Sequence, residues 1–462
     1  MAQTKERQKP SLIQEYCKGC GRCISVCAKG CIAFTKEINH LTGIAPVLLD
    51  LEKCNACGLC IDACPEPYGL LALEPDESFQ LYGPAKLHGQ DLGAPKPAKD
   101  VAAQRVPLPK TEPMIIKGNY AAAIGAMLAG CRHMYGYPIT PSSEGAELMA
   151  KFLPKLKGWF LQAVSEVATI NHMYGTAGAG LPTMTFTSSP GFSLMLEGIS
   201  YMIGAELPSV IINVMRGGPG LGNIAPEQAD IKLACRGLGH GNTHAICLSP
   251  STPQEVLDLT MAAFELAHKY RNPVIVLVDG YLGQMTGKVN LPSHLEKPGV
   301  PGWAVYGDGA HRQNLISSID LAEVDLEKRN ERLCAKYDSM KAEARAESFM
   351  ANDAEVLLVA CNTPARISKG AVQDLRDAGI KAGLFRPITL WPFPVEQIKG
   401  ILPHVKSLVL VEASAGQLEN ELRLELSLAG VEKLPAVSHV RRMGGMLPQQ
   451  TDVVAHVKSV AK

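Results

Sequence analysis

The chain has 462 residues, of which 46% are hydrophobic and 19% charged, as is typical of a globular protein with several domains. Lys and Arg together number 45, as do Asp and Glu, so no net charge would attract nucleic acid or an anionic membrane surface. The polar start MAQTKERQKP lacks the apolar core of a signal peptide, and apolar runs such as Pro273–Val278 fall far short of the ~20 residues that cross a bilayer. We therefore expect a cytoplasmic protein without a membrane span and without a nucleic-acid partner.

Two cysteine runs stand near the start of the chain. They are CKGCGRCISVC at Cys17–Cys27 and CNACGLCIDACP at Cys54–Pro65, and both have the spacing C-x2-C-x2-C-x3-C. This spacing is that of bacterial ferredoxins with two [4Fe-4S] clusters, in which the fourth cysteine of each run binds the other cluster. The first cluster is then expected on Cys17, Cys20, Cys23 and Cys64. The second is expected on Cys54, Cys57, Cys60 and Cys27.

The spacing argues against structural zinc, because zinc ribbons use two C-x2-C pairs rather than two runs of four. Glycines between the ligands, such as Gly19 and Gly58, would let backbone N–H groups approach the sulfurs. Ala28 departs from the pattern, which usually has Pro after the fourth cysteine. Cys31 is a ninth cysteine outside the pattern, and we expect it to be a small buried hydrophobic residue rather than a ligand.

The whole chain predicts three folded domains. Residues 1–75 are expected to form a small α+β ferredoxin-like domain, and residues 76–112, rich in Pro, Gly, Ala and charge, a linker arm. In residues 113–292, short β-branched runs alternate with helical stretches, which predicts an α/β domain with a mainly parallel sheet and ligands at the carboxyl ends of its strands. Residues 293–351 predict a linker with a charged helix, a connector rather than a site. Residues 352–462 predict a second, smaller α/β domain.

Three polar residues of residues 113–292 have two interpretations each when only their neighbours are considered. Glu166, at the start of a predicted helix, is either a buried acid shielded by flanking apolar residues or a first-turn glutamate stabilised by the helix dipole. Thr140, in YPITPSS, has a hydroxyl that could bind a ligand, while Ser142 or Ser143 would cap the next helix. Arg216, at the end of a predicted strand, could clamp a carboxylate or form a structural ion pair.

Several long stretches resemble one family. They include YGYPITPSSEGAELM, AVSEVATINHMYGTAGAG, TFTSSPGFSLMLEGISYMIGAELPSVIINVMRGGPGLG, YRNPVIVLVDGYLGQM, FRPITLWPFP and RRMGGMLP. They resemble the alpha subunit of 2-oxoacid:ferredoxin oxidoreductases, above all the branched-chain 2-oxoacid and 2-oxoglutarate types, over about residues 114–292 and 352–448. The ferredoxin-like start is a departure, because the plainest alpha subunits have that module as a separate chain.

The resemblance implies a multidomain α/β protein with a thiamine diphosphate-binding, pyrimidine-type domain and a transketolase C-terminal-like domain. The implied reaction is CoA-dependent oxidative decarboxylation of a 2-oxoacid to an acyl-CoA and CO2, with electrons passed through [4Fe-4S] clusters to ferredoxin or a flavoprotein. In this family Glu166 would face the aminopyrimidine of the cofactor, with Val164, Val167 and Ala168 shielding it. Thr140 and Arg216 would hold the substrate. Ser189, Pro190 and Gly191, in the Gly/Pro loop TSSPG, would lie against the cofactor.

The resemblance also implies partner subunits. A beta subunit would bring the diphosphate and magnesium half of the site, a gamma subunit is expected as well, and the assembly would be a dimer of heteromers. GDG at Gly307–Gly309 matches the start of a thiamine diphosphate–magnesium signature, but the closing asparagine pair is missing, so we expect no magnesium site in this chain. The alternative is an iron–sulfur electron-transfer adaptor whose α/β domains are a non-catalytic scaffold. The 2-oxoacid and the electron acceptor stay open.

Overall fold

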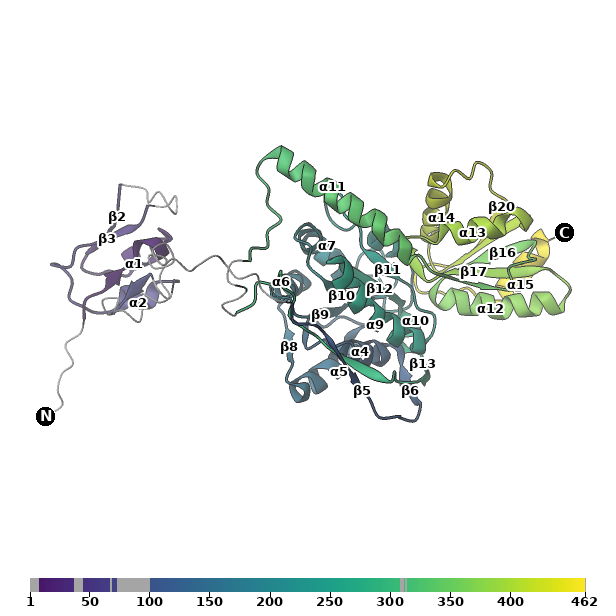
Figure 1. Ribbon diagram of the computed structural model, residues 1–462, viewed down its shortest axis with the longest axis horizontal. Helices are drawn as coiled ribbons and strands as arrows, with labels where there is room; N and C mark the ends of the chain where they lie inside the picture. Colours follow the sequence, from purple (N-terminus) through teal and green to yellow (C-terminus); the bar gives the residue numbers. More distant parts are fainter. Residues whose placement is uncertain are drawn as a thin grey trace. The chain divides into compact units, whose positions relative to one another are not determined.

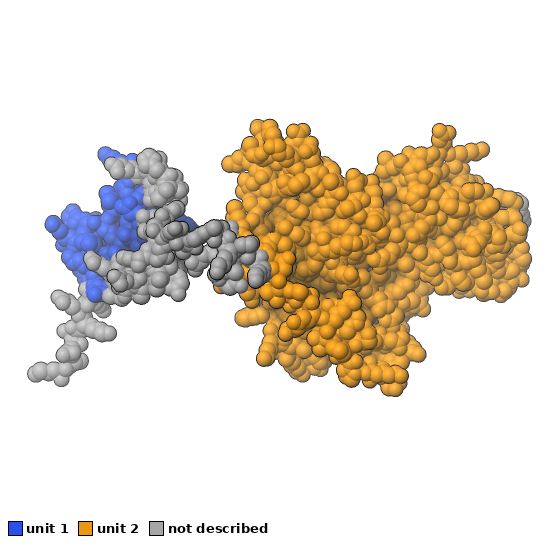
Figure 2. All heavy atoms as spheres, in the orientation of Figure 1, with its two compact units in different colours: residues 1–95 blue, residues 96–462 orange. Residues whose placement is uncertain are grey.

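The computed structural model describes residues 8–36, 45–66, 69–72, 100–307, 311 and 314–461. Most of the expected arm, residues 76–99, and the last two residues of the GDG motif lie outside the described residues. The chain divides into two compact units, residues 1–95 and 96–462 (Figure 2), and each is considered by itself. Within the described residues, no helix is both long and apolar enough to cross a bilayer.

The smaller unit is built from two short antiparallel sheets and two short helices. Strand β1 (Ser11–Leu12) pairs with β4 (Leu70–Leu71), and β2 (Ile32–Phe34) pairs with β3 (Val47–Leu49). A 3-10 turn covers Gln14–Tyr16. Helices α1 (Arg22–Ser25) and α2 (Leu59–Ala63) each follow a glycine in the left-handed region, Gly21 at φ 73° and Gly58 at φ 82°. The unit thus has the expected α+β ferredoxin-like character.

The larger unit contains a seven-stranded sheet in the order β18-β11-β12-β10-β9-β7-β8 (Figure 1). These strands are β18 (Thr389–Trp391), β11 (Ile246–Leu248), β12 (Pro273–Asp279), β10 (Ser209–Met215), β9 (Thr183–Thr187), β7 (His133–Gly136) and β8 (Trp159–Gln162). Every pair is parallel except β11 with β18. All residues of β10 and β12 are buried, as expected for central parallel strands covered on both faces.

The helices of this domain form two packed groups. Helix α4 packs on α5 and α9, and α6 packs on α7. Their bounds, with those of the two shorter helices, are α4 (Gly118–Leu128), α5 (Ser143–Phe152), α6 (Glu166–Gly178), α7 (Ser189–Gly204), α8 (Ile231–Arg236), α9 (Pro253–Tyr270) and α10 (Gly280–Gln284). Each of α6, α7 and α10 starts just beyond a strand, which brings the first turns of these helices to one edge of the sheet. The parallel α/β class expected for this domain is confirmed.

The second α/β domain has a five-stranded sheet in the order β15-β17-β16-β19-β20. Its strands are β15 (Ala346–Phe349), β17 (Ala382–Pro387), β16 (Val356–Val359), β19 (Ser407–Glu412) and β20 (Ala436–Arg441). Its helices are α12 (Asn362–Asp377), α13 (Val395–Ile401), α14 (Gln417–Leu428) and α15 (Gln450–Val460). The segment after β17 leaves this sheet and adds β18 to the edge of the first sheet, so the two domains share a boundary made of backbone pairing.

Segments expected as linkers take part in the larger unit. Residues at the end of the expected arm form β5 (Gln104–Pro107), which pairs antiparallel with β14 (His294–Lys297). Next to it, β6 (Met114–Lys117) pairs with β13 (Thr286–Val289). The β5–β14 pair joins residues of both expected linkers, and β14 also packs on α4 of the first α/β domain, so part of each linker belongs to the folded body.

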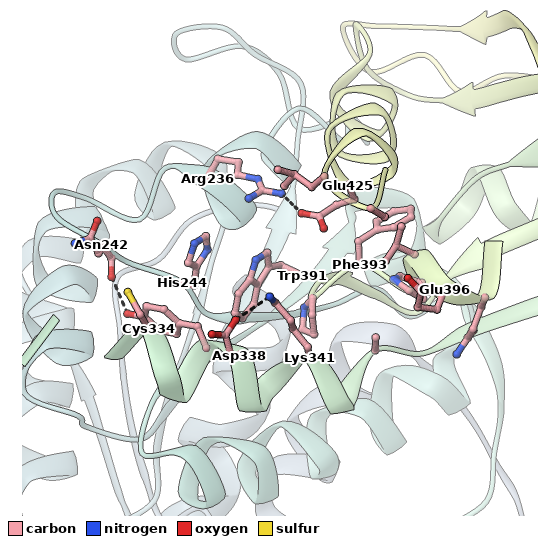
Figure 3. A pocket seen from close by; sticks show the side chains of 18 residues that line it. Arg236, Asn242, His244, Cys334, Asp338, Lys341, Trp391, Phe393, Glu396 and Glu425 are labelled. Atoms are coloured by element: carbon pink, nitrogen blue, oxygen red, sulfur yellow. Dashed lines mark hydrogen bonds and ion pairs between the residues drawn. The ribbon is translucent and has the colours of Figure 1, made fainter. Parts of the chain in front are cut away.

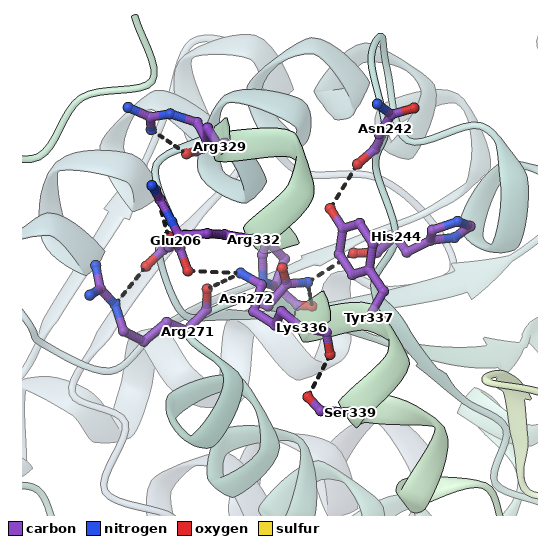
Figure 4. Close-up of polar contacts among 12 residues, drawn as sticks. Glu206, Asn242, His244, Arg271, Asn272, Arg329, Arg332, Lys336, Tyr337 and Ser339 are labelled. Atoms are coloured by element: carbon purple, nitrogen blue, oxygen red, sulfur yellow. Dashed lines mark hydrogen bonds and ion pairs between the residues drawn. The ribbon is translucent and has the colours of Figure 1, made fainter. Parts of the chain in front are cut away.

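The charged helix α11 (Glu323–Met340) is more than the expected connector, because from Arg329 onward it contacts the first α/β domain (Figure 4). Lys336 Nζ lies 3.2 Å from Glu206 Oε2, and the Tyr337 hydroxyl donates to the Asn242 carbonyl at 2.8 Å. Burial is the main cause that lowers the pKa of Lys336. Tyr337 itself is buried in the large hydrophobic core, so the helix is anchored by apolar as well as polar contacts.

Candidate functional site

The predicted site residues of the larger unit meet at the carboxyl ends of β7, β9 and β10. Glu166 is the first residue of α6, and Ser165 caps this helix by accepting a hydrogen bond from the Ala168 N–H at 3.2 Å. Glu166 stands in the first turn of α6, and its side chain is only 5% exposed, so it is a buried acid at a helix start. The expected shielding by the flanking valines is wrong, because Val164 is 87% and Val167 45% exposed.

Glu166 is buried by the start of α7 instead. A Cβ atom placed on Gly191 would overlap with Glu166 Oε1 and with Thr187 Oγ1, and would lie 2.8 Å from Glu166 Cγ. A side chain at position 191 would therefore force the Glu166 carboxylate or the Thr187 hydroxyl to move. Thr187 Oγ1 is buried and has no hydrogen-bond partner in the described part of the chain, so a polar group without a protein partner lies beside this carboxylate.

The TSSPG segment is the first turn of a helix rather than a loop. Ser188 is the N-cap of α7, and Ser189, Pro190 and Gly191 are its first residues. The Gly191 N–H donates to the Ser188 carbonyl at 2.7 Å, so this N–H is used within the chain. The Ser189 hydroxyl accepts from the Arg216 backbone N–H at 3.0 Å, which ties this turn to the end of β10.

Arg216 and Thr140 are brought together across the sheet edge. Arg216 Nη1 donates to the Thr140 carbonyl at 2.8 Å, and Nη2 donates to the Leu221 carbonyl at 3.0 Å. No carboxylate of the described residues pairs with Arg216, so the structural ion pair is not the arrangement found, and its buried Nε has no partner there. Ser142 is the N-cap of α5, but its hydroxyl donates to the Ile139 carbonyl at 2.7 Å instead of capping the helix.

Two buried acids beneath Arg216 were not predicted. Glu227 Oε2 accepts from the Gly218 N–H at 2.8 Å, and Asp230 Oδ2 accepts from Asn213 Nδ2 at 2.9 Å. Burial raises the pKa of Asp230, and the hydrogen bonds from Ser189 and Asn213 act against that shift. Sequence reasoning missed both acids because they stand in a loop, NIAPEQAD, whose composition is that of a solvated turn.

The second α/β domain completes this edge. Asn223 Nδ2 donates to the Gly444 carbonyl at 2.9 Å, so the RRMGGMLP segment lies against the loop that follows Arg216. Thr363 donates its N–H to Asp279 Oδ2 at 2.8 Å, at the end of β12. Large apolar side chains of the two joined loops stay exposed; they are Leu221, Ile224, Met443 and Met446. The site is thus an open edge with an arginine, a buried glutamate and an apolar rim.

The cysteines of the smaller unit gather in the two predicted sets. A cavity of about 200 Å³ is lined by Cys27, Cys54, Cys57 and Cys60, with Cys31 beside them. A smaller cavity, of about 20 Å³, is lined by Cys17, Cys20, Cys23 and Cys64. No described group of His, Cys, Asp or Glu converges to hold a single metal ion, so the sulfurs surround space instead. Burial of Cys31, at 5% exposure, agrees with the expectation for it.

A large cavity lies elsewhere in this unit (Figure 3). It has a volume of about 770 Å³, and the His244 and Trp391 rings stack on its wall with centroids 4.5 Å apart. Burial is the main cause that lowers the pKa of His244. The cavity opens near the amino end of β11, whereas Glu166 and Arg216 lie at the carboxyl ends of the strands, so it is separate from the predicted site.

Three protein families match successive parts of the chain. The family "Pyruvate flavodoxin/ferredoxin oxidoreductase, thiamine diP-bdg" matches residues 124–353, "Pyruvate:ferredoxin oxidoreductase core domain II" matches 354–453, and "4Fe-4S dicluster domain" matches 16–67. The ketoisovalerate oxidoreductase subunit VorB of Methanothermobacter marburgensis is 46% identical over 75% of this chain and 97% of its own. The 2-oxoglutarate synthase subunit KorA of Methanocaldococcus jannaschii is 36% identical over 66% and 90%.

One solved structure is similar over much of the chain. It is the 2-oxoglutarate:ferredoxin oxidoreductase of Magnetococcus marinus, solved with 2-oxoglutarate, coenzyme A and succinyl-CoA bound. The TM-score is 0.67 at 28% identity, and the match covers 76% of this chain and 66% of that one.

Proposed function

Because the chain belongs to the 2-oxoacid:ferredoxin oxidoreductases, with a thiamine diphosphate-binding domain and a 4Fe-4S dicluster domain, we propose that it supplies the proton-exchanging half of the thiamine site and the electron relay for oxidation of a branched-chain 2-oxoacid. One observation carries the assignment of the site. The buried Glu166 carboxylate lies against Gly191 and the unpartnered Thr187 hydroxyl, at the same sheet edge as Arg216.

The residues at this edge fit a cofactor whose reactive ring needs a proton donor and acceptor. When bound, thiamine diphosphate supplies a nucleophilic carbon for the 2-oxo group and an electron sink for loss of CO2. Glu166 would exchange a proton with the aminopyrimidine nitrogen N1′, since no described residue forms a hydrogen bond or ion pair with its carboxylate. Arg216 would bind the substrate carboxylate, and the exposed Thr140 hydroxyl would donate to the same substrate.

The rim of the site favours an apolar substrate. Leu221 and Ile224 on one loop, and Met443 and Met446 on the other, are large exposed apolar side chains held together through the Asn223–Gly444 hydrogen bond. A 2-oxoacid with a branched alkyl chain would bury this surface, whereas a second carboxylate would not. The higher identity with the ketoisovalerate oxidoreductase subunit supports the same choice.

The remaining half of the reaction requires other chains. A beta subunit would bring the diphosphate and magnesium half-site, a gamma subunit would complete the complex, and two such heteromers would associate as a dimer. CoA would accept the acyl group. Ferredoxin or a flavoprotein in the cytoplasm would take the electrons from the clusters held by the eight cysteines.

The test is a substrate panel on the complex purified without oxygen together with its partner subunits. Reduction of a low-potential dye is followed with branched-chain 2-oxoacids, 2-oxoglutarate and aryl 2-oxoacids, with and without CoA. We expect CoA-dependent reduction that is fastest with a branched-chain 2-oxoacid. A preference for 2-oxoglutarate would contradict the substrate assignment. No reduction with any 2-oxoacid, in a complex with full iron content, would favour the adaptor with a non-catalytic scaffold.

A further inference from the structure

Cys31 lies at a position that its expected role as a small buried hydrophobic residue does not explain. Its side chain lines the same cavity as Cys27, Cys54 and Cys60, which also contains Cys57. It is held there from two sides, since its carbonyl accepts from the Asp50 N–H at 2.7 Å and the next residue, Ile32, starts strand β2. Five sulfurs therefore border a cavity that needs four ligands for a cubane.

Cys31 contacts one of these four sulfurs through its backbone. Its N–H donates to Cys27 Sγ at 3.3 Å. Its side chain lines the same cavity as that sulfur. A cysteine that binds no metal carries an S–H donor, whereas a ligand thiolate can only accept. Of these two neighbouring side chains, the Cys31 thiol is therefore the one able to donate, and Cys27 Sγ can only accept.

The other cysteine run lacks this thiol. Four residues after Cys27 the chain has Cys31, and four residues after the equivalent Cys64 it has Tyr68, which lies outside the described residues. The two runs are otherwise identical in spacing. The two cysteine runs therefore differ at this position, because only the first has a cysteine four residues after its last ligand.

Hydrogen bonds to a ligand sulfur change the potential of an iron–sulfur cluster. Reduction adds a negative charge that is spread over the sulfurs, and a donor stabilises that charge, so the reduced form is favoured. We propose that Cys31 binds no iron but donates to Cys27 Sγ, and thereby raises the reduction potential of the cluster on Cys27, Cys54, Cys57 and Cys60 above that of the cluster on Cys17, Cys20, Cys23 and Cys64. The electron entering this unit would then rest on the former cluster, which becomes the exit side of the relay. This inference rests on the proposed function only in requiring that the unit holds two cubanes.

The test is a redox titration of the full chain in its anaerobically purified complex, followed by electron paramagnetic resonance, with iron content measured in parallel. Cys31→Ala removes the thiol but keeps the backbone N–H. We expect full iron content, a lower midpoint potential for one cluster and an unchanged potential for the other. Cys31→Ser restores a side-chain donor and should return the lowered potential toward the wild-type value. Ile32→Val is the matched control, because Ile32 lines the same cavity, has no donor, and loses one methyl group.

Three outcomes would overturn the inference. Unchanged potentials in Cys31→Ala would show that the thiol does not tune the cluster. Loss of about half the iron in Cys31→Ala would make Cys31 a ligand instead of a donor. An equal shift in Ile32→Val would assign the effect to packing. A wild-type chain without two cubane signals would overturn the proposed function itself, which separates that failure from these three.

Discussion

The contact between Glu166 and Gly191 makes a sharp prediction for Gly191→Ala. The new methyl group would overlap with Glu166 Oε1 and Thr187 Oγ1, and would lie 2.8 Å from Glu166 Cγ. Such overpacking in a filled interior costs about 1–3 kcal/mol of unfolding free energy. Because the carboxylate is one of the atoms that must move, we also expect turnover to fall by more than the loss of stability explains. A shift of about 1 Å at a reacting group costs roughly 100-fold in rate.

Gly175→Ala is the matched control. Gly175 lies inside α6, the helix that carries Glu166, and a Cβ placed there meets no atom within 4 Å. Replacing an unhindered helical glycine by alanine stabilises a helix by about 0.5–1 kcal/mol. The assay compares denaturant midpoints of both variants with turnover and iron content of their complexes. If Gly191→Ala matched Gly175→Ala in stability and in turnover, the packing of Glu166 against α7 would be refuted.

Three further predictions concern the same unit. Arg216→Lys loses the planar group that reaches the Thr140 and Leu221 carbonyls. Because a charged hydrogen bond contributes about 1.5–3 kcal/mol, the KM for the 2-oxoacid should rise roughly 10- to 100-fold. An unchanged KM would show that Arg216 does not bind the substrate. Asp279→Ala leaves the buried Thr363 and Leu282 N–H groups without an acceptor. We expect the free energy of unfolding, measured in urea, to fall by about 3 kcal/mol. A decrease below about 1 kcal/mol would contradict the role of Asp279 at the domain boundary. Burial lowers the pKa of His268, so as the pH falls the imidazole is protonated in the unfolded chain before it is protonated in the folded one. The stability of the fold should therefore decrease below about pH 6.5, and more steeply in the wild type than in His268→Gln. Equal slopes in the two proteins would refute this role of His268.

Local patterns in the sequence predicted most of the framework. The runs SVIINVM and PVIVLVD became buried parallel strands because a continuous apolar run suits only a strand covered on both faces. The two cysteine sets line separate cavities as the ferredoxin spacing predicts, with the fourth cysteine of each run in the other set. The strand β18 was beyond such reasoning, since its residues pair with a strand over a hundred residues earlier in the chain.

The site was predicted only in part, for a related reason. Glu166 and Arg216 stand in motifs, but what surrounds them is set by tertiary contacts. Neighbours in sequence suggested that Val164 shields Glu166, whereas Gly191 of another helix buries it. Asp230 could not be told from a solvated loop acid, because its burial depends on Asn213 of a neighbouring strand.

The most direct test of the central claim is the turnover of Glu166→Gln in the anaerobically purified complex. The change keeps the shape of the side chain and removes the proton exchange. We predict that CoA-dependent dye reduction falls at least ~100-fold, the lower limit for loss of general acid–base catalysis, while iron content and both cluster signals stay unchanged. Glu265→Gln, at an exposed position on α9, should leave turnover as it is. Near wild-type turnover in Glu166→Gln would contradict the account.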